Sequence, residues 1–178
     1  TLYAYGWFNL YKNPTTYSDI KIRIVQPSIP QESKWNADKF LQNLHLHRDL
    51  SMMETGFKPD IILWSEAAVT IPHNIPKLRH FLTEITKDTN AILITGSVSE
   101  RDNKTYTSVV ALDPSGDILL EYHKKHLVPF GEYMPLKKYI PIKKLTDGFE
   151  NYLPGKTDSV FYLKKLKIKI RPMICYES

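Results

Sequence analysis

The sequence predicts an α/β fold built as a single globular domain. Short strand-like runs at residues 20–25, 60–64 and 91–95 alternate with two stretches whose apolar residues recur at helical spacing. The 178 residues are 42% hydrophobic, which provides enough apolar surface to bury a core at this chain length. The single cysteine excludes an intramolecular disulfide framework and a cysteine-rich zinc site.

The first twelve residues contain five aromatic side chains, a residue class that favours membrane–water interfaces. Their composition leaves two alternatives, an interfacial segment and an aromatic edge strand. Pro14 and the small polar residues around it predict a linker that ends near residue 19. No apolar run in the sequence reaches the length of about 18 residues that a membrane-spanning helix needs.

A strand and a long helix are predicted next. The run at residues 20–25 predicts a strand that ends before Pro27. Asn36 is a favoured N-cap residue, and the apolar side chains that follow it predict a helix of about 20 residues that ends near Gly56. The continuous apolar run at residues 60–64 is typical of a strand that is buried on both faces.

The second helix and a hairpin complete the predicted sheet. Pro76 predicts the start of the helix, which leads into the strand at residues 91–95. Residues 106–112 and 117–122 then show strand-like patterning on either side of an Asp-Pro-Ser-Gly turn at residues 113–116. This arrangement predicts an antiparallel hairpin.

A long loop and two short strands lead to the cysteine. About 35 residues rich in Pro, Lys and aromatic side chains follow the hairpin, and loops of this length inside a domain usually carry function. Two further strand-like runs, at residues 159–163 and 166–170, precede Cys175.

Three residues could together carry out acyl transfer. Glu66 and Cys175 each follow a predicted strand, where the functional residues of α/β folds gather. By position alone, Glu66 could equally cap a helix, and Cys175 could be a core thiol. A lysine of the segment 122–133, Lys124 or Lys125, completes the set, because a lysine beside a thiol lowers its pKa and can face an oxyanion while a carboxylate takes the thiol proton. We expect the three to meet at one end of the sheet.

Other functional classes find less support in the sequence. His45 and His47 are two residues apart on a predicted helix, so they face in different directions and make a poor metal pair. His123 and His126 flank Lys124 and Lys125 and are better placed to orient a lysine than to bind a metal, and we expect no cofactor. Residues 121–178 hold 12 Lys and Arg against 6 Asp and Glu, which fits a solvated basic face or attraction to anionic lipid. No nucleic-acid-binding motif accompanies this charge, so we expect no nucleic-acid partner.

Three ordered motifs resemble the carbon–nitrogen hydrolase (nitrilase) superfamily. They are Trp-Ser-Glu-Ala at residues 64–67, the run from Lys124 to Glu132, and Ile-Cys-Tyr-Glu at residues 174–177. The resemblance implies the nitrilase-like α-β-β-α sandwich of that superfamily. It also implies a catalytic triad of Glu66 as general base, Lys124 as oxyanion stabiliser and Cys175 as nucleophile.

Further motifs narrow the resemblance to the family of apolipoprotein N-acyltransferases. These motifs are Ile-Val-Gln-Pro-Ser-Ile-Pro-Gln at residues 24–31, Lys-Trp at 34–35, Leu-Val-Pro-Phe-Gly-Glu-Tyr-Met-Pro at 127–135 and Pro-Gly at 154–155. The resemblance implies transfer of an acyl chain from a phospholipid, through a cysteine thioester, to the diacylglyceryl-cysteine of a lipoprotein. It also implies a location at the bacterial inner membrane with the catalytic domain on the periplasmic side.

The same resemblance implies supporting roles for other residues. Glu132 would orient the lysine or the base, and Tyr176 and Glu177 would shape the turn of the nucleophile. Trp35 would lie near the lipid entrance. Four apolar residues of a lid-like loop would suit acyl chains: Leu127, Phe130, Met134 and Ile140.

We expect residues 1–19 to be a juxtamembrane lead-in and residues 20–178 to be a partial catalytic domain. The reason is that the domain of the resembled family continues past its nucleophile and is flanked by membrane-spanning helices. Two alternatives remain. One is a soluble amidase of the superfamily with water as acyl acceptor, which the aromatic lead-in and the apolar-basic loop disfavour. The other is an inactive fragment that serves only as an interaction or remnant domain.

Overall fold

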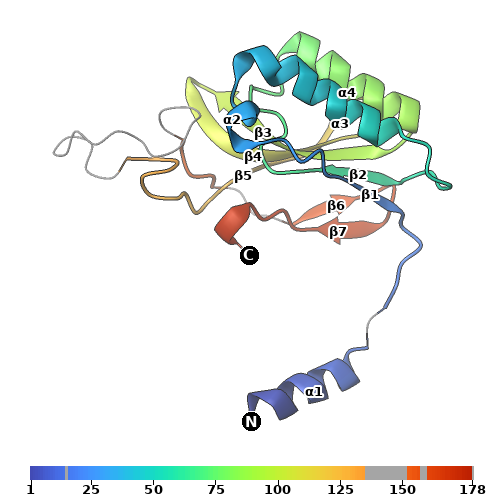
Figure 1. Cartoon of the computed structure of the whole chain (residues 1–178). Coiled ribbons are helices and arrows are strands. Elements are labelled where there is room, and N and C mark those ends of the chain that lie inside the picture. The colour runs from blue at the N-terminus through green and yellow to red at the C-terminus, as the bar shows by residue number, and fades with distance from the viewer. Residues whose placement is uncertain (15, 135–151, 157–159, 178) are drawn as a thin grey trace.

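A five-stranded sheet forms the centre of the fold. The structure is a computed structural model, and it describes residues 1–14, 16–134, 152–156 and 160–177. The strands follow the order β1-β2-β3-β4-β5, with β1 to β3 parallel and β3 to β5 antiparallel (Figure 1). Their bounds are Ile22–Val25, Ile61–Trp64, Ile92–Arg101, Lys104–Leu112 and Ile118–His123. The predicted α/β fold and the predicted hairpin, now β4 and β5, are confirmed.

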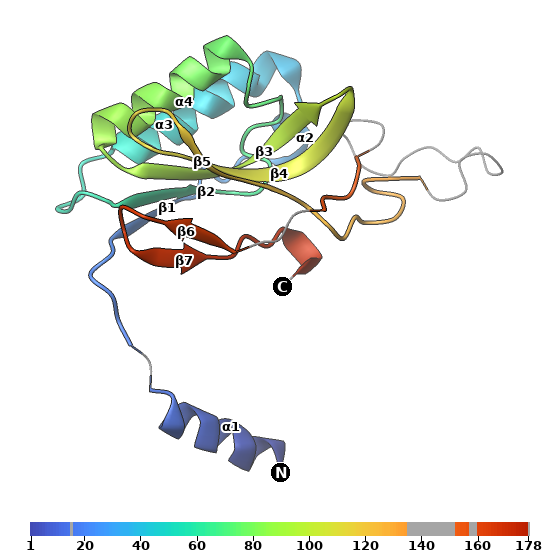
Figure 2. The ribbon, with the colours of Figure 1, turned by 180° about the vertical axis from the view of Figure 1, so that it is seen from behind.

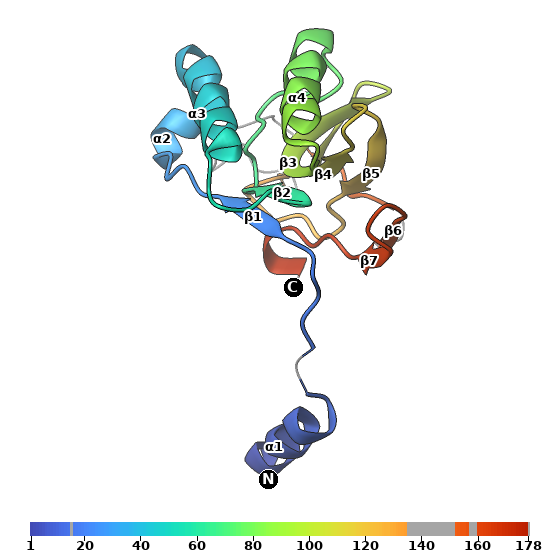
Figure 3. The ribbon, with the colours of Figure 1, turned by 90° about the vertical axis from the view of Figure 1, so that its right-hand side faces the viewer.

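Two helices cover one face of this sheet. Helices α3 (Phe40–Met52) and α4 (Pro76–Thr89) run side by side across it, as the end-on view of Figure 3 shows. Pro76 stands at the first turn of α4, as predicted. The helices and the sheet enclose the larger core cluster, in which Ile62, Leu82 and Leu93 are fully buried.

A two-stranded sheet covers part of the opposite face. Strands β6 (Phe161–Leu163) and β7 (Ile168–Ile170) pair antiparallel and lie beneath the main sheet (Figure 2). Leu163 packs there against Ile61 and Ile92 in a second core cluster. The layers are therefore helix, sheet and a second sheet, which is the order expected of the nitrilase-like sandwich.

The predicted helix after residue 36 is shorter than expected. Residues 31–39 form two short turns, α2 (Gln31–Lys34) and η1 (Ala37–Lys39), and the long helix begins only at Phe40. The side chain of Asn36 does cap a helical turn, since it accepts a hydrogen bond from the Asp38 amide at 2.8 Å. The α-helix is shorter than predicted because residues 37–39 adopt 3₁₀ geometry and because Met53, with φ −57° and ψ 132°, already leaves the helical conformation.

The first twelve residues form a helix, so the edge-strand alternative is wrong. Helix α1 (Leu2–Lys12) buries no residue and lies apart from the rest of the chain in all three views (Figures 1–3). Pairs four residues apart stabilise it, because Trp7 stacks on Tyr11 at 5.7 Å and Lys12 lies over the ring of Phe8 at 4.7 Å. Among the described residues, no helix combines the length and apolarity needed to cross a membrane.

The third strand continues six residues beyond its predicted end. Strand β3 runs through Gly96 to Arg101 and turns back into β4 at Asp102 and Asn103. Both turn residues have positive φ, at 53° and 56°, as a two-residue hairpin turn of type I′ requires. Asp and Asn tolerate this conformation without glycine, which explains why the sequence analysis missed the hairpin.

Removing a buried leucine from α3 should destabilise the protein far more than removing an exposed one. Leu44 is 3% exposed in the core and Leu41, on the same helix, is 66% exposed. We expect Leu44→Ala to lower the free energy of unfolding by about 2–5 kcal/mol. The matched variant Leu41→Ala should change it by less than about 0.5 kcal/mol. Urea unfolding followed by circular dichroism measures both, and equal effects would contradict this packing of α3.

Candidate active site

The loop that carries Glu66 is pressed against strand β3. It begins directly after Trp64, where β2 ends. A Cβ atom built on Gly96 of β3 would lie 2.6 Å from the amide nitrogen of Ala67 and 2.8 Å from the Cα of Glu66. Only glycine permits so close an approach of two backbones. The amide of Val69 also donates to the carbonyl of Gly96 at 3.2 Å, so the Glu66 loop is fixed to β3 from both sides of the glutamate.

Glu66 and Cys175 line one cavity. Its volume is about 150 Å³, and the other residues on its walls include Thr95, Ser108 and Met173. Both Glu66 and Cys175 are exposed, as a base and a nucleophile that act on an external substrate must be. The structure therefore brings together the two residues that the sequence analysis placed after strands.

Cys175 stands on a tight turn with an unusual backbone conformation. Its φ is +56°, which is uncommon for a residue other than glycine. The turn continues as the short helix η2 (Cys175–Glu177), and the preceding Ile174 is buried at 3% exposure. Such conformations persist only where the surroundings hold them, and they cluster at functional sites.

The carboxylate of Glu177 ties this turn to the segment around Lys124. It accepts hydrogen bonds from the amide of Ile174 at 3.0 Å, the amide of Lys125 at 2.7 Å and the amide of His126 at 3.2 Å. Both of its oxygens also lie 2.9 Å from the hydroxyl of Tyr122, which donates to them. One side chain thus joins residues 174–177 to residues 122–126.

The contact between Glu177 and Tyr122 contributes to the pKa shifts of both side chains. Burial raises the pKa of the Glu177 carboxyl, but the hydrogen bonds donated to it outweigh burial, so its pKa lies below the ordinary value. Burial, followed by the hydrogen bond to Glu177 and its negative charge, raises the pKa of Tyr122 to about 12. At neutral pH the pair is therefore a carboxylate that accepts from a neutral phenol.

Lys124 is fully buried and paired with Glu132. Its side chain is 1% exposed, and Nζ donates to one carboxylate oxygen of Glu132 at 3.0 Å and lies 2.9 Å from the other. Glu132 also accepts from the amide of Val128 at 2.8 Å. A buried ammonium needs such a partner, because an unpaired charge inside a protein is strongly destabilising.

A second glycine contact fixes the backbone of Lys124. The amide of Gly155 donates to the carbonyl of Lys124 at 2.8 Å, and a Cβ on Gly155 would collide with the backbone oxygen of His123. The amide of Lys124 donates in turn to the carbonyl of Thr107 at 2.9 Å. The sequence analysis gave no structural reason for either Gly96 or Gly155, although each is required where two backbones touch.

The remaining candidates lie in different surroundings. Within the described chain, Lys124 is not one of the residues that line the cavity of Glu66 and Cys175. Trp35 is half-buried at the end of α2, and Tyr176 is 81% exposed. Of the proposed lid residues, Ile140 lies outside the described residues.

No cluster of three or more His, Cys, Asp or Glu side chains in the described ranges is arranged to hold a metal ion.

Comparison with known proteins identifies the family. The family model described as carbon-nitrogen hydrolase matches residues 21–178. The chain belongs to the carbon–nitrogen hydrolase family. An amidase of this fold from Nesterenkonia sp. aligns with a TM-score of 0.55 over 83% of this chain and 52% of its own, at 17% sequence identity, which supports the shared fold.

Relatives with a higher sequence identity to the chain are bacterial acyltransferases. The chain is 50% identical to the apolipoprotein N-acyltransferases of Rickettsia typhi and Rickettsia prowazekii over 181 aligned residues. It is 47% identical to that of Rickettsia bellii. Each alignment covers 98% of this chain and 36% of the relative, so the chain spans about a third of the length of these curated proteins.

A methyl group on Gly96 should displace the Glu66 loop. Gly96→Ala places Cβ against the backbone of residues 66 and 67, which has no flexible side-chain end that could move away. We expect the free energy of unfolding to fall by about 1–3 kcal/mol. The amide resonances of Glu66 and Ala67 should shift in a ¹⁵N-correlation spectrum.

Gly6→Ala is the matched control, because no heavy atom lies within 4 Å of the Cβ it would add to α1. This variant should leave the stability unchanged or slightly higher, since alanine favours helix. An unshifted spectrum and a wild-type stability for Gly96→Ala would show that the loop does not pack on β3 as described.

Proposed function

We propose that the chain forms the catalytic part of an apolipoprotein N-acyltransferase. The observation that carries this proposal is its 50% identity, over almost its whole length, to enzymes of that name. The proposed reaction moves an acyl chain from a phospholipid to the α-amine of a diacylglyceryl-cysteine at the N-terminus of a lipoprotein. The proposed location is the bacterial inner membrane, with this domain on the periplasmic side.

In the first half-reaction, Glu66 takes the proton of the Cys175 thiol. The thiolate attacks the carbonyl carbon of the acyl ester and forms a carbon–sulfur bond. The carbon–oxygen bond of the ester then breaks, and the departing lysophospholipid oxygen takes the proton from Glu66. The product is a thioester on Cys175. The shared cavity of Glu66 and Cys175 supports this pair of roles.

In the second half-reaction, the amine of the acceptor attacks the thioester. The nitrogen loses a proton to Glu66, the carbon–sulfur bond breaks, and the thiolate regains that proton. An amide and the original thiol remain. Each half-reaction passes through a tetrahedral oxyanion, which Lys124 would stabilise with its positive charge.

Two carboxylates would hold these groups in place. Glu132 contacts Nζ of Lys124, which supports its role in orienting the ammonium. Glu177 contacts both the cysteine turn and the backbone after Lys124, which supports its role in shaping the nucleophile turn. A role at the lipid entrance for Trp35, and a lid-like role suited to acyl chains for Leu127, Phe130 and Met134, remain part of the proposal.

Substitutions of the three proposed catalytic residues should abolish or severely slow acyl transfer. In the complete encoded protein, Cys175→Ala should form no acyl-enzyme, and Cys175→Ser should lose most of it, because an alcohol is far harder to ionise. Glu66→Gln and Lys124→Ala should each slow the reaction by a factor on the order of 10² or more. Mass spectrometry of the trapped thioester and transfer to a diacylglyceryl-cysteine peptide provide the two measurements.

Lys125→Ala is the matched control for Lys124→Ala, because the contact of Lys125 with Glu177 uses its backbone amide and survives the substitution. It should have a mild effect. A thioester on the Cys175→Ala protein, or a severe loss in Lys125→Ala alone, would contradict the assigned roles. Release of free fatty acid or ammonia without transfer to the peptide would instead favour a hydrolase with water as acceptor.

A further inference from the structure

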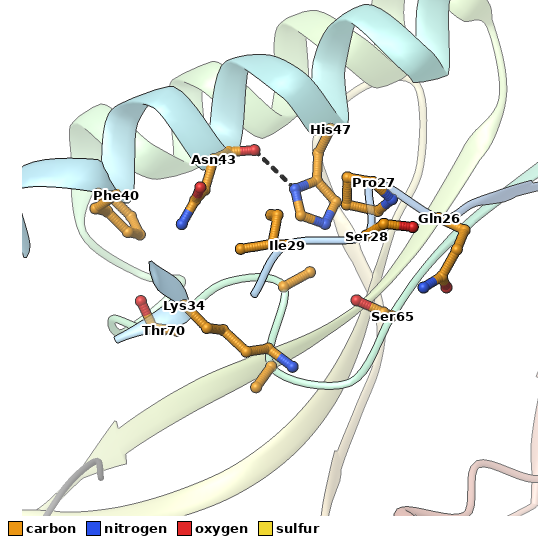
Figure 4. A pocket seen from close by; sticks show the side chains of 12 residues that line it. Gln26, Pro27, Ser28, Ile29, Lys34, Phe40, Asn43, His47, Ser65 and Thr70 are labelled. Carbon is orange, nitrogen blue, oxygen red and sulfur yellow. Dashed lines mark hydrogen bonds between the residues drawn. The ribbon is translucent and has the colours of Figure 1, made fainter. Parts of the chain in front are cut away.

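We propose that a second cavity, on the helix-covered side of the sheet, binds a small anion that carries a hydroxyl group. The cavity has a volume of about 130 Å³ and lies between α3 and the loops that follow β1 and β2. Figure 4 shows His47 projecting into it from α3, with the Lys34 side chain extending below. Its polar walls are Gln26, Ser28, Lys34, Asn43, His47, Ser65 and Thr70.

A buried histidine gives this cavity an unused hydrogen-bond acceptor. His47 is 1% exposed, and its Nδ1 lies 2.8 Å from the carbonyl of Asn43, to which it donates (Figure 4). That bond places the proton of the neutral ring on Nδ1 and leaves a lone pair on Nε2. Within the described residues, Nε2 has no hydrogen-bond partner.

The ring is held in its neutral form. Burial lowers the pKa of His47 most, the hydrogen bond to Asn43 raises it, and the positive charge of Lys34 lowers it further, so the pKa lies below the ordinary value. A neutral ring with Nδ1 occupied can only accept at Nε2. A ligand that places an O–H or N–H group against Nε2 would satisfy this acceptor.

The charge of the walls selects an anion. Lys34 is the cation that lines the cavity, and no aspartate or glutamate is among its lining residues. No ion pair involving Lys34 occurs among the described residues. An anionic group beside Lys34 and a hydroxyl group against His47 would satisfy both ends, and the hydroxyls of Ser28, Ser65 and Thr70 can bond to either group.

The cavity backs directly onto the candidate active site. Ser65 and Ala67 line it, while Glu66 between them lines the cavity of Cys175. Ala67 has a positive φ of 51°, which turns the backbone between the two cavities. The start of this loop is also tied to α3, because the indole of Trp64 donates to the hydroxyl of Ser51 at 2.8 Å and packs against the ring of His47 at 4.7 Å. Lys34 and His47, which would hold the anion, have no role in the proposed acyl transfer.

The probe for this site is sn-glycerol 3-phosphate, which combines a phosphate with free hydroxyl groups. Propyl phosphate has the anion without the hydroxyls, and glycerol has the hydroxyls without the anion. In the complete encoded protein labelled with ¹⁵N-histidine, glycerol phosphate should shift the Nε2 resonance of His47 in a saturable manner. Propyl phosphate should bind at least about tenfold more weakly, the value of one lost hydrogen bond to a buried acceptor, and glycerol should cause no shift.

Variants and vesicles complete the test. Lys34→Gln should weaken glycerol phosphate binding at least about tenfold, as expected for loss of a charge-assisted contact, whereas Lys77→Gln on the exposed side of α4 should leave it unchanged. A saturable shift of the His47 resonance by vesicles of phosphatidylglycerol, but not by vesicles of phosphatidylcholine, would identify the ligand as a lipid headgroup. A shift by glycerol phosphate but by neither kind of vesicle would identify it as a free phosphate ester. Equal binding of propyl phosphate, an unaffected Lys34→Gln protein, or a His47 resonance that no probe shifts would overturn the proposal and leave a cavity filled by water alone.

Discussion

The carboxylate of Glu177 is the contact on which the arrangement of the candidate site depends. It accepts from an amide three residues before it and from groups more than 50 residues away along the chain. Hydrogen bonds to an ionised acceptor are about twice as strong as neutral ones, so this group can hold two loops together where no strand pairing does. The cysteine turn and the segment of Lys124 are therefore positioned as one unit.

Close backbone contacts position the other parts of the site. Gly96 admits the Glu66 loop against β3, and Gly155 lies against the backbone of His123 and Lys124. Each contact combines close backbone packing with a hydrogen bond, because the amide of Val69 donates to Gly96 and the amide of Gly155 donates to Lys124. They hold the backbones of Glu66 and Lys124 in place, which is the preorganisation that the proposed acyl transfer would need.

Local patterns in the sequence predicted most of the fold. The apolar run of β2 and the Pro76 start of α4 are short-range signals, and both elements formed where they were expected. Two elements were missed for physical reasons. Helix α1 is stabilised by pairs of aromatic and cationic side chains four residues apart, although aromatic residues are typical of strands. The turn after β3 uses Asp102 and Asn103 at positive φ without glycine.

The sequence suggested residues for the candidate site but not the contacts that surround them. Positions after strands indicated Glu66 and Cys175, which line one cavity. The hydrogen bond between Tyr122 and Glu177 spans 55 residues, and no spacing rule in one sequence reveals such a pair. No spacing rule indicated a role for His47 either: the sequence analysis judged it only as a poor metal partner of His45, whereas it lies buried against Trp64, and its Nε2 has no partner among the described residues.

Hydrogen exchange of individual amides in the Glu177→Ala protein tests most directly whether one carboxylate joins the two loops. In the wild type, the amides of Ile174, Lys125 and His126 all donate to Glu177, whereas the amide of Lys124 donates to Thr107. We predict that the first three lose protection together, by about tenfold or more, while Lys124 keeps its own. Unchanged protection of Lys125 and His126 in this variant would contradict the account.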